Sequence, residues 1–299
     1  MPHTHHAGFE LWEVGINLTL VFTALFYVCG WVQVRRLNRD SVKGWHVASF
    51  LSGLFFIWLA MASPIAVLDH RLLTVHMIHH LLLMTLAPPL IWLGAPKPML
   101  RGFPPLAKMS GEFLRWTPVK RLETTIAHPA VCWLAAATTL IAWHIPSLFA
   151  FGMRSETWHE IEQASFLLTG LLFWWPVMRP QPSVSNWSGW TTLLYLFLAT
   201  LPCDILSGFL VFCDRVVYPV YSSSPQRFGL SALEDQQCAG ALMWTCVTVV
   251  YLIAGTILAA RLLSPRRVRH SQAANASTAS SKAGTRGRKL ETPWHFANH

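Results

Sequence analysis

Three histidines stand close together in the segment His76-Met77-Ile78-His79-His80. On a helix His76 and His80 lie one turn apart on the same face, whereas His79 is rotated by about 60° from His76. Imidazole nitrogen is a ligand for copper, zinc and haem iron. The spacing therefore predicts that His76 and His80 bind a metal or haem together. We expect His79 to pack within the protein and to tolerate substitution.

Further ionisable and sulfur-bearing side chains stand in later apolar stretches of the chain. The predicted metal ligands are His76, His80, His144, His159 and Asp235. A second set could line the same site or orient its imidazoles, namely His79, Glu162, Met84, Asp204 and Met243. Alternatives stay open for each residue type. A lone histidine also serves as a strut between helices, methionine also fills cores, and Asp235 also suits the cap of its own helix.

Apolar helices must position these residues. The chain has 299 residues, of which 53% are hydrophobic and 12% charged, and its mean hydropathy is +0.38. Soluble domains carry roughly 25% charged residues, so this composition is typical of a membrane protein. Several runs are long enough to cross a hydrocarbon core about 30 Å thick. They lie near 11–34, 45–63, 72–93, 128–150, 158–178, 189–213 and 235–263. The sequence therefore predicts an all-α bundle of seven transmembrane helices.

Basic residues predict the orientation of these helices, because cytoplasmic loops carry an excess of Lys and Arg. Most basic residues fall in the loops 35–44 and 94–127 and beyond residue 260. The opposite side carries Arg71, Arg154, Arg215 and Arg227. We therefore expect the N-terminus outside and the C-terminus in the cytoplasm of a bacterial inner membrane. The net charge of +9 then faces anionic lipid, and no motif indicates nucleic-acid binding.

Composition also divides the chain into three parts. Residues 1–10 form a predicted periplasmic stub with His3, His5 and His6, and residues 11–263 form the transmembrane domain. Residues 264–299 are rich in Ser, Ala and Arg, which predicts a disordered cytoplasmic tail. The first apolar run has no preceding Lys or Arg and no small-residue cleavage pattern, so we expect it to be retained as a helix.

Two local features bear on the helices and their loops. Pro88 and Pro89 stand inside the third run, where proline should kink or end the helix. Cys213 and Cys238 flank one outer loop, and they either pair or remain separate small apolar residues.

The predicted topology also gives the depth of each candidate residue, at about 1.5 Å per helical residue. The ionisable candidates fall in the outer halves of five helices. Such groups are costly in a bilayer and mark sites or cavities. We therefore predict a polar cavity that opens toward the periplasm. His76 and His80 form one wall of this cavity, and His144, His159 and Asp235 form the opposite walls.

Four stretches of the sequence carry a resemblance to a known family. They are 76–84 continuing into 87–90 and 93–96, then 143–146, then 158–162 with 165–167 and 173–176, and finally 235–240 with 243–244. Together they resemble the CtaG-like assembly factors of caa-type cytochrome c oxidases, a family of seven-helix bacterial membrane proteins, over roughly residues 45–260. The resemblance implies a role in maturing the metal centres of the oxidase, with copper as the cargo. His76, His80, His144, His159 and Asp235 match polar positions of the family, whereas His79 falls where we expect no histidine.

These observations support three functional hypotheses, none of them enzymatic. The first is an assembly factor that holds or delivers copper on the periplasmic side, with haem–copper oxidase subunits and a periplasmic copper donor as partners. The second is a redox protein that binds haem through histidine pairs. The third is a scaffold for oxidase subunits in which the histidines serve only helix packing. A transporter stays open, but a retinal protein is excluded because the last run lacks a Schiff-base lysine, and a metalloprotease because H-E-x-x-H is missing.

Overall fold

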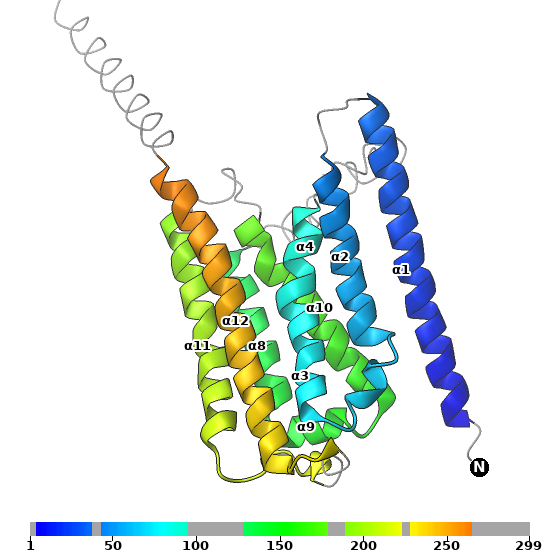
Figure 1. The fold of residues 1–299 in the computed structure, drawn as a ribbon, viewed down its shortest axis with the longest axis vertical. Helices are drawn as coiled ribbons and strands as arrows, with labels where there is room; N and C mark the ends of the chain where they lie inside the picture. Colours follow the sequence, from blue (N-terminus) through cyan, green and yellow to red (C-terminus); the bar gives the residue numbers. More distant parts are fainter. Residues whose placement is uncertain (1–3, 38–42, 95–127, 179–188, 223–227, 265–299) are drawn as a thin grey trace, which may run out of the picture. The chain divides into compact units, whose positions relative to one another are not determined.

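All of the apolar runs form helices in the computed structural model of the protein (Figure 1). The structure describes residues 4–37, 43–94, 128–178, 189–222 and 228–264. The elements are α1 (Thr4–Leu37), α2 (Gly44–Met61), η1 (Ala66–Leu68), α3 (Leu73–Leu81), η2 (Leu82–Leu86), α4 (Ala87–Leu93), α8 (Pro129–His144), α9 (Pro146–Gly152), α10 (Glu156–Met178), α11 (Gly189–Phe212), η3 (Pro219–Tyr221) and α12 (Ala232–Leu263). No strand occurs in the described ranges, and the predicted all-α class is confirmed for them.

Two compact units make up the chain, Met1–Leu252 and Ile253–His299. The second unit is described only through the last turns of α12. Helix α1 begins at Thr4, so it takes in most of the stretch that we predicted as a separate stub. The predictions for His3, for the basic loop within 95–127 and for the tail beyond residue 264 lie outside the described residues.

Five helical segments are long and apolar enough to cross a membrane. They are Val14–Leu37, Gly44–Met61, Leu73–Leu93, Gly189–Phe212 and Ala232–Leu263. The bent pair α8–α9 makes a sixth if it is counted as one span. Helix α10 has 23 residues but is not among these candidates. Length and composition thus support five or six of the seven predicted spans, and the orientation of the termini stays a prediction.

The third span contains a π-helical turn just before its two prolines. The segment η2 lies between α3 and α4 and directly precedes Pro88 and Pro89. Because Pro88 has no N–H, it cannot donate a hydrogen bond to the carbonyl of Met84. That carbonyl instead accepts a hydrogen bond from Nε1 of Trp174 in α10, at 3.2 Å. The kink predicted at the prolines is therefore a π-helical turn that widens the helix. Trp174 of α10 donates its hydrogen bond to the backbone of this turn.

The fourth span, predicted as one run over 128–150, is sharply bent. Helices α8 and α9 meet at an angle of 82°, with Ile145 between them and Pro146 as the first residue of α9. Proline favours the start of a helix and disfavours helical backbone in the residue before it. His144 is the last residue of α8. Its carbonyl accepts a hydrogen bond from the hydroxyl of Tyr218 at 2.9 Å. The bend thus ends α8 at a residue predicted to be a metal ligand.

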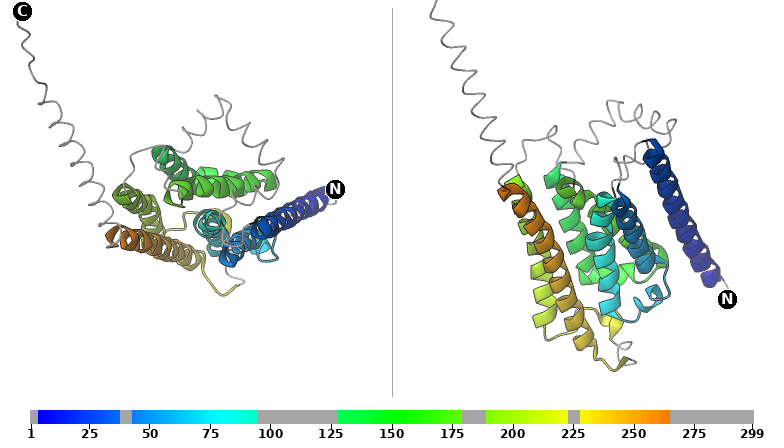
Figure 2. Two further views of the ribbon diagram at one scale, coloured as in Figure 1. Left: turned by 90° about the horizontal axis from the view of Figure 1, so that it is seen from above. Right: turned by 45° about the horizontal axis from the view of Figure 1, so that its top comes forward.

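The third span packs against both α2 and α10, and the view from above shows it between them (Figure 2, left). Glycine permits the closest of these contacts. A Cβ atom on Gly170 of α10 would lie 2.8 Å from Cα and 2.9 Å from the carbonyl oxygen of Met84. Small residues allow helix backbones to approach in this way inside membranes. The approach places the N-terminal half of α10 directly against the histidines of α3.

Candidate metal centre

Helices α3 and α10 bring two imidazoles and one carboxylate together. His76 and His80 share one face of α3, and Glu162 lies on the buried stripe of α10. The Nε2 atoms of the two histidines are 2.8 Å apart, and they lie 3.6 and 3.3 Å from Oε1 of Glu162. Their exposed fractions are 0%, 5% and 1%, so all three side chains are buried. We call these three residues the inner group.

The spacing of the inner group suits a single metal ion. Ligand atoms about 2.0–2.1 Å from a tetrahedral ion lie about 3.3 Å from one another. The three ligand atoms here lie within 4.8 Å of one another. Within the described part of the chain, neither oxygen of Glu162 accepts a well-formed hydrogen bond. A buried carboxylate without such partners is costly, and a nearby cation or protonated imidazole stabilises it unless the carboxyl group itself takes up a proton.

His144 approaches the inner group from α8. Its Nδ1 lies 2.7 Å from the carbonyl oxygen of Leu140, which can only accept, so Nδ1 carries the proton in the neutral ring. The other nitrogen, Nε2, then presents a lone pair, and it lies 3.3 Å from the sulfur of Met77. The rings of His144 and His80 have centroids 6.0 Å apart. The structure thus places His144 beside His80 of α3, while its role as a ligand stays a prediction.

A small cavity of about 40 Å³ adjoins these residues. His80 and His144 line it together with sulfur-bearing side chains from four helical segments, namely Met77, Met84, Cys203 and Met243. Thioethers and thiols are soft ligands that suit Cu(I), and they also pack well as ordinary apolar groups. Met84 and Met243 thus lie beside the candidate ligands, and their part in binding stays a prediction.

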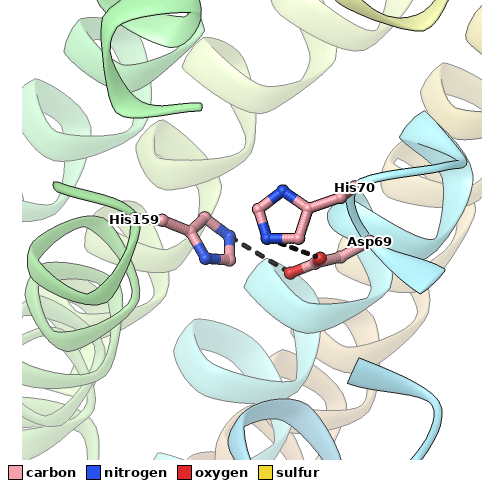
Figure 3. A group of neighbouring side chains, drawn as sticks. All are labelled: Asp69, His70 and His159. Atoms are coloured by element: carbon pink, nitrogen blue, oxygen red, sulfur yellow. Dashed lines mark ion pairs between the residues drawn. The ribbon is translucent and has the colours of Figure 1, made fainter. Parts of the chain in front are cut away.

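A second cluster lies where α3 and α10 begin (Figure 3). Asp69, in the connection before α3, lies 3.1 Å from Nε2 of His159, 3.4 Å from Nε2 of His70 and 3.4 Å from Nδ1 of His79. Asp69 is 2% exposed, whereas the side chain of His70 is 47% exposed. Burial by itself raises the pKa of Asp69, but the contacts with His159 and His79 hold that pKa well below its usual range. We call these four residues the outer group.

The two groups are neighbours. The rings of His76 and His159 have centroids 5.5 Å apart, and they form the boundary between the inner and the outer group. Tyr221, from η3, packs over this boundary, with its ring 6.5 Å from that of His76 and its hydroxyl donating to the carbonyl of Asp69 at 2.6 Å. The predicted set of ligands is thus divided, because His159 lies with Asp69 and not with Glu162.

Asp235 does not join either group among the described residues. Its carboxylate accepts hydrogen bonds from the backbone N–H of Leu73 at 2.7 Å and of Thr74 at 3.2 Å, and from the Thr74 hydroxyl at 2.7 Å. It therefore caps the first turn of α3. The alternative that Asp235 caps its own helix is wrong, since the hydroxyl of Ser231 accepts from the N–H of Glu234 at the start of α12. As a metal ligand Asp235 stays an untested prediction.

Asp204, Cys213 and Cys238 belong to neither group, whereas His79 belongs to the outer group. Asp204 is on α11, and within the described chain its Oδ1 is buried without a hydrogen-bond partner. Cys213 and Cys238 are free thiols. His79, which we expected to tolerate substitution, is 1% exposed and faces Asp69, so its replacement should disturb the outer group.

Asp69, His70 and Met77 were missed by reasoning from the sequence. Asp69 and His70 precede the third apolar run, and candidates were sought within such runs. Met77 stands between two predicted ligands but points toward His144 and not along their face. A signal for Asp69 was available, because it is an acidic residue seven positions before His76 at the predicted outer end of that helix.

Comparison with known proteins agrees with the resemblance in the sequence. The family described as "Cytochrome c oxidase caa3 assembly factor (Caa3_CtaG)" matches residues 25–264. The chain belongs to this family. The match includes both groups of candidate ligands and the residues that hold them in place.

Individual relatives are longer than this chain. "Uncharacterized protein Mb0105" of Mycobacterium bovis and "Uncharacterized protein MT0111" of Mycobacterium tuberculosis are each 26% identical to it over 270 residues. These matches cover 84% of this chain and 40% of each relative. "Uncharacterized protein ML1998" of Mycobacterium leprae is 23% identical over 254 residues, which cover 82% of this chain and 38% of the relative. The chain therefore spans about two fifths of the length of these relatives. No solved structure matches it.

Proposed function

We propose that the protein holds copper at the inner group and passes it on during the assembly of a haem–copper cytochrome c oxidase. The observation that carries this proposal is the buried carboxylate of Glu162 beside two imidazoles whose Nε2 atoms are 2.8 Å apart. A cation at this position satisfies the carboxylate and uses both nitrogens as ligands. Membership of the oxidase assembly factor family supports copper as the cargo.

The donor atoms around the inner group favour copper over harder ions. Imidazole nitrogen suits copper and zinc, and thioether sulfur favours Cu(I). His144 and Met77 supply one donor of each kind within reach of His80. The adjoining cavity of about 40 Å³ is far below the roughly 300–1,000 Å³ of pockets that hold organic ligands, which speaks against a porphyrin between His80 and His144.

The proposed role needs no chemical turnover. The copper would be received on the periplasmic side from a donor protein and released to an oxidase subunit. In the predicted topology the inner group lies in the outer half of the membrane, so the ion has a short path in both directions. Oxidase subunits and a periplasmic copper donor are therefore the proposed partners, and the protein is not proposed to be an enzyme.

Complementation of a strain that lacks the protein tests this function. The strain receives the wild type, the double variant His76→Ala/His80→Ala, or the control His128→Asn. His128 caps α8 at its far end, 16 residues before His144, and asparagine keeps a cap there. We expect the control to restore oxidase activity and oxidase copper content, and the double variant to lose most of both while it still accumulates in the membrane. Full oxidase activity with the double variant would favour a scaffold whose histidines serve only packing.

A further inference from the structure

We propose that the outer group, Asp69 with His70, His79 and His159, is a second copper site that captures the ion before it reaches the inner group. This inference rests on the proposed function, because the outer group is assigned as the entry site for the copper that the inner group holds. It concerns residues that reasoning from the sequence did not connect, since Asp69 and His70 lie outside the apolar runs.

The geometry of the outer group is that of a metal site built from three segments. Asp69 and His70 come from the connection before α3, His79 from α3 and His159 from α10. Asp69, His70 and His159 each offer one ligand atom within 4.8 Å of the others. Nδ1 of His79 lies beside them, 3.4 Å from Oδ2 of Asp69, close to the separation of about 3.3 Å expected between ligands of one tetrahedral ion. Within the described residues, neither ring nitrogen of His79 has a hydrogen-bond partner, and neither has Oδ1 of Asp69. Among these residues, Nδ1 of His79 and Oδ1 of Asp69 make ion-pair contacts at 3.4 Å but no hydrogen bond, which leaves both atoms able to ligate an ion.

Exposure places the outer group between the aqueous surface and the inner group. The His70 side chain is 47% exposed, whereas Asp69 is 2% exposed and His76, beyond it, is 0% exposed. His159 contacts Asp69 on one side and has its ring 5.5 Å from that of His76 on the other. Only the ring of His159 thus separates an ion bound at the exposed imidazole of His70 from the ligands of the inner group.

The donor atoms identify the form of copper that the outer group takes. It offers nitrogen and oxygen only, without a sulfur ligand, and such a set suits Cu(II) and Zn(II) better than Cu(I). The inner group also offers nitrogen and oxygen, so Cu(II) can pass inward without a redox step. The probe for the outer group is therefore Cu(II) itself.

The test counts the Cu(II) ions retained by the purified full-length protein in detergent, after loading and removal of free metal. We expect two ions per chain for the wild type and for His128→Asn, and one ion for His70→Ala and for Asp69→Asn. We expect one ion for His80→Ala as well, with an electron paramagnetic resonance spectrum different from that of His70→Ala. His70 is half exposed, so its replacement should leave the fold intact. We also expect His70→Ala to load its remaining site at least several-fold more slowly.

Unchanged copper content in both His70→Ala and Asp69→Asn would overturn the second site. An unchanged rate of loading in His70→Ala would overturn its place on the way to the inner group. Failure of the proposed function looks different. In that case His70→Ala loses all bound copper, while His80→Ala and Glu162→Gln keep as much as the wild type.

Discussion

Among single residues, Glu162 distinguishes a metal site from a simple pair of hydrogen-bonded histidines. Two neutral imidazoles with Nε2 atoms 2.8 Å apart form one N–H···N bond without an ion, although among the described residues neither Nδ1 atom has a hydrogen-bond partner. A buried carboxylate 3.3 Å from one of these rings is costly while it is charged, and a positive charge beside it offsets that cost. Either a bound cation or a proton on the imidazole supplies this positive charge. The two cases differ in whether Glu162 contributes to the binding of copper.

Replacement of Glu162 by glutamine keeps the shape of the side chain and removes its charge. We expect Glu162→Gln to weaken copper binding by roughly 10- to 100-fold, as loss of a group that holds or orients metal ligands generally does. Competition with a chelator of known copper affinity measures the change. Glu160→Gln, the same substitution on the same helix in a residue that belongs to neither group, is the matched control and should bind copper like the wild type. Equal affinity in both variants would show that Glu162 plays no part in binding.

At the scale of the helices, two contacts fix the positions of the candidate ligands. Gly170 lets α10 approach the π-helical turn η2, and Asp235 of α12 caps the first turn of α3. Neither residue needs to touch a metal. Gly170 sets the distance between α10 and α3, on which the separation of Glu162 from His80 depends. Asp235 fixes the start of α3, and with it the direction in which His76 points.

Substitution of Gly170 by alanine should force α10 away from η2. The added Cβ would lie 2.8 Å from Cα of Met84, which is too close without movement of the backbone. We expect Gly170→Ala to lower the free energy of unfolding by about 1–3 kcal/mol and to weaken copper binding as well. Thermal unfolding in detergent and a copper titration measure the two effects. Gly208→Ala is the control, because its Cβ would meet Trp244 at an ordinary 3.9 Å. If both variants behave alike, the close approach of α10 has no role in the site.

Removal of the Asp235 carboxylate should loosen the first turn of α3. Asp235→Ala leaves the N–H groups of Leu73 and Thr74 without their acceptor, and we expect a loss of about 1–3 kcal/mol in stability. Asp235→Asn, which retains one acceptor oxygen, should lose less. Thermal unfolding of the purified variants without copper gives this order. If Asp235→Ala instead keeps its stability and loses copper selectively, Asp235 is a ligand, as first predicted from the sequence.

The sequence predicts the positions of the helices along the chain better than the directions in which their candidate ligands point. The apolar runs mark the helices, and the period of three to four residues on α10 places His159 and Glu162 on one buried face. The division of the ligands into two groups depends on the path of residues 62–72 between α2 and α3, for which the sequence has no periodic signal. The 82° bend after His144 has a partial signal in Pro146, although proline does not by itself set an angle.

At the scale of the whole molecule, the buried histidines and carboxylates of the described residues gather near the end where α3 and α10 begin. Asp69, His76, His79, His159 and Glu162 all lie there and are less than 10% exposed. Because ionisable groups in a membrane are costly, this clustering indicates one functional end of the molecule. The distribution of Lys and Arg predicts that this end faces the periplasm.

Reporter fusions test the predicted topology and the status of α10. Alkaline phosphatase is active only outside the cytoplasm. Green fluorescent protein fluoresces in the cytoplasm, but it does not fluoresce after export through the general secretory route. We expect a phosphatase fusion after Arg154 to be active, and fluorescence from fluorescent-protein fusions after residue 180 and at the C-terminus. Phosphatase activity after residue 180 would mean that α10 does not cross the membrane.

Copper retention in the His70→Ala background tests the inner group most directly, because the outer group is then disabled. The purified full-length protein is loaded with copper, freed of unbound metal and assayed for copper per chain. We predict that His70→Ala retains one ion, and that the further change His76→Ala/His80→Ala removes it without unfolding the protein. A metal-free His70→Ala protein, or equal copper in the presence and absence of His76 and His80, would contradict the proposal that this buried group holds copper.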